Sequence, residues 1–389
     1  MGNAAELDSI NRDKLVPLVR TALGTDTLEV IDWQLVPIHG GGGLGTTIYR
    51  VVGTGRDGGK DVDWSIILKI IHAAGEDEEP CDWNHCKREA LIYASGMLDD
   101  LPAGLSAPRC LGAEDPSLDC SWLWLEDIPH TSKQPWSLSD YATVARQLGR
   151  FNGAYLVGEQ PLPAYPWLSK EWLRGWTEKS APAIALFPGI LESPLIHRCF
   201  PTSAMADGFL RIWDERADFL DVLKRLPQVF CHRDAFRRNL FLRPDYTDTD
   251  RLVAIDWAFA GPGAVGEELV PLVLAGITFF EVEPSIIGDL EQVAFEAYLE
   301  GLRDAGWQGD PRIVRLGYAA SAALRYGPGC AVPALAFLTD PAAQHIASQL
   351  FGVTAEEAAD RVSLMFTHVL DLADEARQLM DVLPQTASR

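Results

Sequence analysis

The sequence has no Cys-x-x-Cys pair, no long apolar run and no excess of basic residues, and each absence excludes a class of protein. Its seven cysteines are scattered, which favours reduced thiols over disulfides or a zinc site. The longest apolar run, residues 269–280, is too short to cross a bilayer and contains Pro271. The N-terminus lacks a basic region followed by an apolar core. We therefore expect a cytoplasmic protein with no secretory signal and no membrane partner.

The charge of the chain is strongly negative, with 55 acidic against 33 basic residues and a net charge of −22. Nucleic-acid binding requires a cationic surface that displaces counterions, so we expect no nucleic-acid partner. An acidic protein attracts cationic ligands, although solubility alone also explains the charge. With 47% hydrophobic and 23% charged residues over 389 positions, the chain is globular in composition and long enough for two lobes or domains.

The most informative segment comprises residues 232–239, which read His-Arg-Asp followed by an Asn five residues after the Asp. A second carboxylate, Asp256, follows an apolar run. Phosphoryl transfer needs a carboxylate beside the attacking hydroxyl and oxygen ligands that hold Mg²⁺ on the nucleotide phosphates. Asp234, Asn239 and Asp256 are residues of these kinds in the right order. Because short motifs recur by chance, the upstream sequence must support this interpretation.

A glycine-rich turn lies upstream, between strand-like runs at residues 33–38 and 46–52. Glycines let backbone amides approach phosphate oxygens without obstruction by side chains. The candidate phosphate-binding positions are Gly42, Gly43 and Gly45. Taken alone, the run is more simply interpreted as a flexible hairpin loop.

Lys69 lies within an apolar strand-like run, where an ammonium group is costly to bury unless it is paired. Glu89 follows on a predicted helix, and a strand lysine paired with a helix glutamate holds the α- and β-phosphates in kinases. The alternatives are an exposed lysine and a solvated carboxylate. Further on, the apolar run 121–125 ends in acidic residues and Pro129, which is typical of an interdomain hinge or of an ordinary strand end.

In this order, the motifs resemble the aminoglycoside phosphotransferase and choline kinase-like family, small-molecule relatives of the protein kinases. The matching elements extend from Gly40 to about Leu269. The resemblance implies an α+β, protein kinase-like two-lobed fold with a small N-lobe on an antiparallel sheet and a larger, mainly helical C-lobe. We expect the N-lobe at residues 1–126, the C-lobe at 127–389 and the hinge near 124–130.

The resemblance also implies roles for the motif residues. Asp234 corresponds to the catalytic base, and Asn239 and Asp256 correspond to the magnesium ligands. Lys69 corresponds to the residue that contacts the phosphates, and Glu89 to the residue that orients it. The implied adenine-binding groups are the backbone near Leu125 and Asp127.

The implied reaction is transfer of the γ-phosphate of ATP to a hydroxyl of a small molecule, with ATP and Mg²⁺ as cofactors. Aminoglycosides, amino alcohols and sugars are all compatible acceptors, and the acidity of the chain tilts the choice slightly toward a cation. The alternative is a catalytically weak or inactive kinase-like module that only binds nucleotide. The missing Ala-Pro-Glu triplet after Asp256 argues against a protein kinase.

Three departures from the family pattern motivate the alternative. Arg233 stands where the family usually has Gly, and Phe236 stands where many protein kinases have Lys. Arg237 or Arg238 could serve the γ-phosphate instead, or both could be a solvated basic pair. Asn152 ends a helix where the family commonly has a Leu-His pair.

The later sequence is mainly helical. We expect helices at residues 140–157, 204–226, 311–327 and 355–383. Asp310 and Thr354 are typical N-caps of the last two. Trp172 and Trp176 lie one helical turn apart and share a face, which suits core packing or a wall of the acceptor site.

Overall fold

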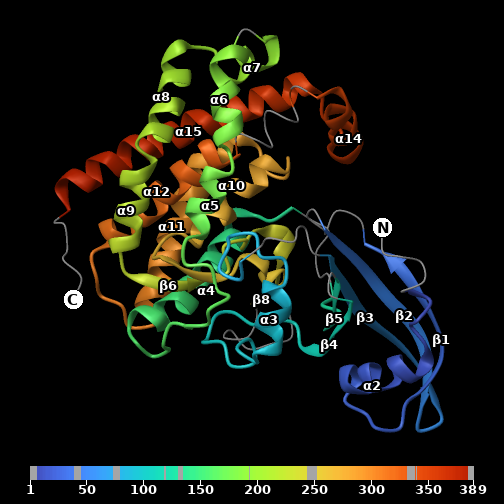
Figure 1. Cartoon of the computed structure of the whole chain (residues 1–389). Helices are drawn as coiled ribbons and strands as arrows, with labels where there is room; N and C mark the ends of the chain where they lie inside the picture. The colour runs from blue at the N-terminus through green and yellow to red at the C-terminus, as the bar shows by residue number, and fades with distance from the viewer. Residues whose placement is uncertain are drawn as a thin grey trace.

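The computed structural model of the chain describes residues 7–38, 45–72, 79–117, 120–129, 135–191, 193–242, 252–330, 338 and 340–383. An N-terminal part built on one antiparallel sheet leads into a larger part made mainly of helices (Figure 1). The predicted α+β architecture is confirmed, whereas the lobe limits at residues 126 and 127 stay a prediction. No helix in these ranges is long and apolar enough to span a membrane. All seven cysteines lie in the described ranges and are free of disulfides.

The sheet has the spatial order β1-β2-β3-β5-β4, and every neighbouring pair is antiparallel. Its strands are β1 (Glu29–Pro37), β2 (Thr46–Asp57), β3 (Lys60–His72), β4 (Cys110–Ser117) and β5 (Cys120–Glu126). One face packs on helix α2 (Arg12–Leu23), which begins at the N-cap Asn11 and ends at Gly24 with φ 68°. Side chains alternate along β3, so Ile66 and Leu68 join this apolar layer while Lys69 points to the opposite face.

Helix α3 (Arg88–Ala94) follows β3 and connects the sheet to the helical part. Its first residue, Arg88, is fully buried. The Arg88 guanidinium donates to the carbonyls of Trp83 at 3.0 Å, Trp167 at 3.0 Å and Ala258 at 3.1 Å, and also to that of Asp82. Because Trp167 and Ala258 belong to the helical part, this one side chain ties the start of α3 to it.

The helical part surrounds one large apolar core. Its helices are α4 (Leu138–Leu156), α5 (Trp172–Glu178), α6 (Ala181–Ile190), α7 (Pro194–Cys199), α8 (Ser203–Asp214), α9 (Arg216–Arg225), α10 (Leu269–Thr278), α11 (Ile287–Asp304), α12 (Pro311–Tyr326), α14 (Pro341–Phe351) and α15 (Ala355–Val382). Short 3-10 turns are η1 (Arg237–Asn239), η2 (Trp257–Phe259), η3 (Pro284–Ile286) and η4 (Pro328–Cys330). Helices α4 and α11 pack closely, because a Cβ on Gly149 would lie 2.2 Å from the Tyr298 carbonyl oxygen.

The caps expected from the sequence are present. Asp310 accepts from the backbone of Arg312 at the start of α12, and Thr354 forms a capping box with Glu357 at the start of α15. The expectation of one helix over residues 204–226 is wrong. The chain forms α8 and α9 instead, and Glu215 at the break accepts from Arg377 of α15 at 2.6 Å.

Four short strands complete the framework and position the polar residues described next. They are β6 (Gln228–Cys231), β7 (Leu240–Leu242), β8 (Leu252–Ala254) and β9 (Gly261–Ala264). β6 pairs with β9 and β7 pairs with β8, both in antiparallel register. Their connecting segments carry Asp234, Asn239 and Asp256.

Candidate active site

Lys69, Glu89 and Asp256 form a buried ionic cluster where the sheet meets the helical part. Lys69 Nζ lies 2.5 Å from Glu89 Oε2 and 2.7 Å from Asp256 Oδ1. Burial alone would lower the pKa of Lys69, but the attraction of Asp256 and Glu89 outweighs it and the pKa is raised. The lysine is therefore an ammonium ion, and the predicted pair of Lys69 and Glu89 is confirmed.

Asp234 and Asn239 lie on the loop between β6 and β7. Asn239 Nδ2 donates to Asp234 Oδ2 at 2.9 Å and to the Asp234 carbonyl at 3.0 Å. The backbone N–H of Ile255 donates to the Asn239 carbonyl at 2.9 Å, which places Asp256 directly after a residue bonded to Asn239. The chain thus brings Asp256 close to Asp234 and Asn239, which lie on a separate loop.

The side chains of Asn239 and Asp256 have oxygens of the kind that Mg²⁺ prefers. The Asn239 amide nitrogen is used by Asp234, so its Oδ1 is the atom left for a metal. Asp256 uses Oδ1 for Lys69, and its side chain keeps 30% exposure. Within the described ranges no group of three or more His, Cys, Asp or Glu could hold a metal, so an ion here would need further oxygens from water or phosphate.

The backbone of the loop is fixed by buried hydrogen bonds. His232 Nε2 donates to the Ile255 carbonyl at 2.9 Å, and its Nδ1 accepts from the Asp234 N–H at 3.2 Å. These roles require a neutral ring, and burial lowers the pKa of His232 to about 4. The carboxylate of Glu268 accepts the backbone N–H groups of His232 at 2.5 Å and of Arg233 at 3.2 Å.

Arg233 combines an unusual backbone with a buried side chain. Its φ is 66°, in the left-handed region that favours glycine. The guanidinium is buried and bonds to Glu267 at 3.1 Å, to the Ser169 carbonyl at 3.1 Å and to the Phe259 carbonyl at 3.3 Å. The arginine in place of the family's usual glycine therefore tethers the loop to its neighbours.

Asn152 of α4 supports the strand that leads into the loop. Its Nδ2 donates to the Phe230 carbonyl at 2.9 Å, and its Oδ1 accepts from the Tyr298 hydroxyl at 2.6 Å. The side chain is fully buried and both ends are bonded. The departure at Asn152 therefore leaves the loop supported.

Arg325 of α12 is the site residue that the sequence did not reveal. Its Nη2 donates to Asp234 Oδ1 at 3.1 Å, and its Nη1 donates to the Arg233 carbonyl. Burial raises the pKa of Asp234 to about 6, although Arg325 opposes the rise. The only local signal is an arginine that follows an alanine-rich stretch of the helix, residues 319–324.

The predicted hinge residues lie at the end of β5. Leu125 is buried and pairs with Ile67 of β3. Asp127 follows the strand, and its Oδ2 lies 2.8 Å from Arg50 Nε of β2. The ion pair joins the sheet to the segment that leaves it.

Gly42 and Gly43 lie outside the described residues. Gly45 has φ 91°, and its carbonyl accepts from the His72 N–H at 2.7 Å, so the residue before β2 is anchored to the end of β3. Arg237 and Arg238 both lie near Glu281, at 3.7 and 2.7 Å. They form a local ionic group rather than a solvated pair.

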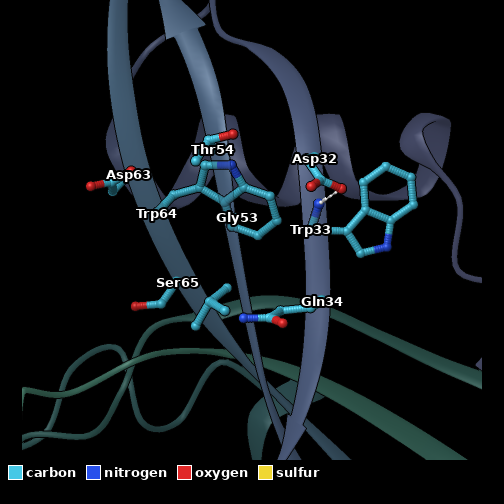
Figure 2. A pocket seen from close by; sticks show the side chains of 9 residues that line it. Asp32, Trp33, Gln34, Gly53, Thr54, Asp63, Trp64 and Ser65 are labelled. Carbon is cyan, nitrogen blue, oxygen red and sulfur yellow. Dashed lines mark hydrogen bonds between the residues drawn. The ribbon is translucent and has the colours of Figure 1, made fainter.

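A separate hollow of about 600 Å³ lies on β1, β2 and β3 (Figure 2). Asp32, Gln34, Thr54, Asp63 and Ser65 are among its lining residues, and none of the predicted site residues is. Ser65 lies on the same face of β3 as Lys69, four residues and about 13 Å away along the strand. The hollow is therefore distinct from the ionic cluster.

Residues 97–305 match the model of the phosphotransferase enzyme family, APH, which is more than half of the 389 residues. The chain belongs to this family. No curated protein matches the chain in sequence. The expected family and enzyme class are thereby confirmed.

Two solved structures share the fold of this phosphotransferase. The amicoumacin kinase hAmiN, in complex with AMP-PNP, Ca²⁺ and Ami, is 14% identical with a TM-score of 0.51, and the match covers 100% of this chain and 98% of that one. Choline kinase from Cryptosporidium parvum Iowa II is 12% identical with a TM-score of 0.52, covering 90% and 92%. The phosphotransferase thus has the two-lobed fold of small-molecule kinases, as predicted.

The structure of the phosphotransferase gathers five predicted site residues into one region: Lys69, Glu89, Asp234, Asn239 and Asp256. Leu125 and Asp127 lie at the end of β5, and Gly45 lies at the start of β2. The catalytic, nucleotide-binding and metal-binding roles of these residues stay predictions.

Proposed function

We propose that this phosphotransferase transfers the γ-phosphate of ATP to a hydroxyl of a small molecule. One observation carries the proposal: Lys69 of the sheet contacts Asp256, whose neighbour Ile255 is bonded to Asn239, which in turn holds Asp234. A cation for phosphates, two metal-binding oxygens and a base are therefore adjacent.

Asp234 accepts the proton of the acceptor hydroxyl as its oxygen bonds to the γ-phosphorus. The bond between that phosphorus and the bridging oxygen breaks, and ADP leaves. A base is most effective when its pKa lies near the working pH, and burial raises the pKa of Asp234 to about 6. Asn239 Oδ1 and the Asp256 carboxylate hold Mg²⁺, which when bound neutralises charge on the phosphate oxygens.

Lys69 binds the phosphates of the nucleotide, and Glu89 orients its ammonium group. The backbone near Leu125 and Asp127 binds adenine in a hinge near residues 124–130, between lobes 1–126 and 127–389. The amides of Gly42, Gly43 and Gly45 contact phosphate oxygens. AMP-PNP and Ca²⁺ in the amicoumacin kinase structure support nucleotide and divalent-metal binding here.

Aminoglycosides, amino alcohols and sugars are the candidate acceptors, and a cation among them agrees with the net charge of −22. The similarity in fold to a choline kinase supports an amino alcohol among these candidates. The cytoplasmic location and the absence of nucleic-acid partners stay predictions.

An ATP-consumption screen over a panel of hydroxylated small molecules tests the proposal. We expect ATP turnover to rise above background with at least one acceptor and to require Mg²⁺. A thermal-shift titration of the same protein should show more stabilisation by ATP with Mg²⁺ than by ATP alone. The stabilisation by ATP with Mg²⁺ should be about 2.7 kcal/mol when the nucleotide is at a hundredfold excess over its Kd.

The contrary result is equally clear. Nucleotide binding that is independent of metal, together with no ATP consumption on any acceptor, would identify an inactive nucleotide-binding module. Arg233 and Asn152 would then be departures that accompany lost catalysis, although both hold the loop in place.

A further inference from the structure

A group of aromatic and cationic side chains lies beside Asp234, and we call it the Lys179 cluster: Trp83, Trp176, Lys179 and Arg325. Lys179 Nζ lies 2.9 Å from the centre of the Trp176 ring and 5.0 Å from that of Trp83. The two indoles meet edge to face with centres 5.7 Å apart. Gly175 makes room for this contact, because a Cβ there would lie 2.2 Å from the Trp83 ring.

The Lys179 cluster is connected directly to the proposed base. Trp176 Nε1 donates to the Arg325 carbonyl at 3.3 Å, and Arg325 Nη2 donates to Asp234 Oδ1 at 3.1 Å. The other carboxylate oxygen of Asp234 faces Asn239, on the metal-binding side. The cluster therefore lies on the side of Asp234 that is free of the proposed metal and nucleotide ligands.

The positive charge of Lys179 has no counter-charge in the part of the chain that the structure describes. No carboxylate lies within 4 Å of its ammonium group there, whereas the Arg325 charge is shared with Asp234. Burial, with a smaller effect of the Arg325 charge and against an opposing effect of Cys330, lowers the pKa of Lys179 to about 8. Burial also raises the pKa of the neighbouring Cys330 thiol to about 11, so this thiol is neutral at pH 7.

The Lys179 ammonium is half-buried and faces aromatic rings but no carboxylate among the described residues, so an anion supplied by a ligand would stabilise it further. We propose that the acceptor is a hydroxylated organic acid whose carboxylate pairs with Lys179 and whose carbon skeleton lies against Trp83. This assignment rests on the proposed function, since it names the acceptor class of the same site.

The net charge of −22 favours a cation only at long range. At physiological salt, charges more than about 8 Å apart are largely screened, so contacts within the site decide which acceptor binds. Within the Lys179 cluster the Arg325 charge is balanced by Asp234, and Lys179 is the cation that faces no carboxylate among the described residues. The local charge therefore favours an acid over an aminoglycoside or an amino alcohol.

Three probes of one shape test the proposal: 4-(hydroxymethyl)benzoate, its neutral amide, and the cationic 4-(hydroxymethyl)benzylamine. Affinity is measured by calorimetry on the full chain with AMP-PNP and Mg²⁺. We expect the benzoate to bind about tenfold or more tightly than the amide, because a hydrogen bond to a charged group is among the stronger ones, and the amine to bind least. Equal affinities, a preference for the amine, or no binding by any probe overturns the proposal.

Lys179→Met should abolish the preference for the benzoate, and Lys179→Arg should restore most of it. Lys170→Met removes the same charge at an exposed position and should leave the preference unchanged. Retained AMP-PNP binding checks that each variant is folded. A benzoate preference that survives in Lys179→Met overturns the proposal.

The two proposals fail in different ways. If the benzoate binds through Lys179 but no acceptor is phosphorylated, the proposed function fails and the carboxylate site stands. If amines are phosphorylated and the benzoate has no advantage, only the carboxylate site fails.

Discussion

Asp234 and Asp256 are the two carboxylates of the site, and they differ in what holds them. Asp234 is bonded to Asn239 and Arg325, both of which belong to the helical part of the chain. Asp256 is paired with Lys69, which belongs to the sheet. The backbone of Asp256 also lies in the left-handed region, with φ 64°, a conformation that costs a non-glycine residue free energy.

The difference separates two tasks that phosphoryl transfer requires. Asp234 is oriented within one lobe, so the proposed base is in place whatever the sheet does. Asp256 belongs to the helical part but is held by Lys69 of the sheet, so the geometry of the proposed metal site depends on how the sheet packs on the helical part. Changes around Asp234 should therefore affect turnover, and changes around Asp256 should affect nucleotide binding.

The largest effect is expected for Asp234→Asn. The amide cannot accept the proton, so kcat should fall by about 10²–10⁴-fold. Nucleotide affinity, measured by calorimetry with AMP-PNP and Mg²⁺, should stay close to that of the wild type because Asn239 and Asp256 are intact. Turnover like that of the wild type would disprove the assignment of the base.

Arg325→Met tests the support of Asp234 from α12. Displacing a catalytic group by about 1 Å can lower the rate about 10²-fold. We therefore expect kcat to fall by up to that factor while KM for ATP stays nearly constant. Arg325→Lys keeps the charge and should recover part of the loss. If KM for ATP rises as much as kcat falls, the separation of the two carboxylates is wrong.

Glu89→Gln tests the other side of the comparison. It weakens the orientation of Lys69 and leaves Asp234 and Arg325 untouched. Because a hydrogen bond to a charged group is worth about 1.5–3 kcal/mol, we expect KM for ATP to rise about tenfold with a smaller change in kcat. A loss confined to kcat would show that Glu89 acts on chemistry rather than on nucleotide binding.

The smallest effect on turnover is expected for Asn152→Ala. It removes both hydrogen bonds of a buried amide, to the Phe230 carbonyl and from the Tyr298 hydroxyl, so the free energy of unfolding should fall by about 2 kcal/mol. Tyr298→Phe removes one of the two bonds and should cost about 1 kcal/mol. Chemical denaturation measures both, and a stability unchanged in Asn152→Ala would contradict its supporting role.

The residues that the sequence revealed belong to local motifs. The spacing of Asp234 and Asn239 is set by one short loop, and Lys69 was recognisable because an ammonium within an apolar strand needs a partner. The caps at Asp310 and Thr354 were predictable for the same reason, since a cap depends on a few adjacent residues.

The residues that it did not reveal depend on tertiary packing. Arg325 reaches Asp234 from a helix 91 positions away, and no local pattern encodes that approach. The break between α8 and α9 places Glu215 against Arg377 of a distant helix, whereas the local sequence is helical on both sides. The support from Asn152 was hidden because its partners come from β6 and α11.

Arg88 has a consequence for where Glu89 can lie. Its guanidinium donates to carbonyls on both sides of the junction between the sheet and the helical part, and it thereby fixes the start of the helix that carries Glu89. Outward rotation of α3 would break several buried hydrogen bonds at once, so the position of Glu89 relative to the helical part is tightly constrained.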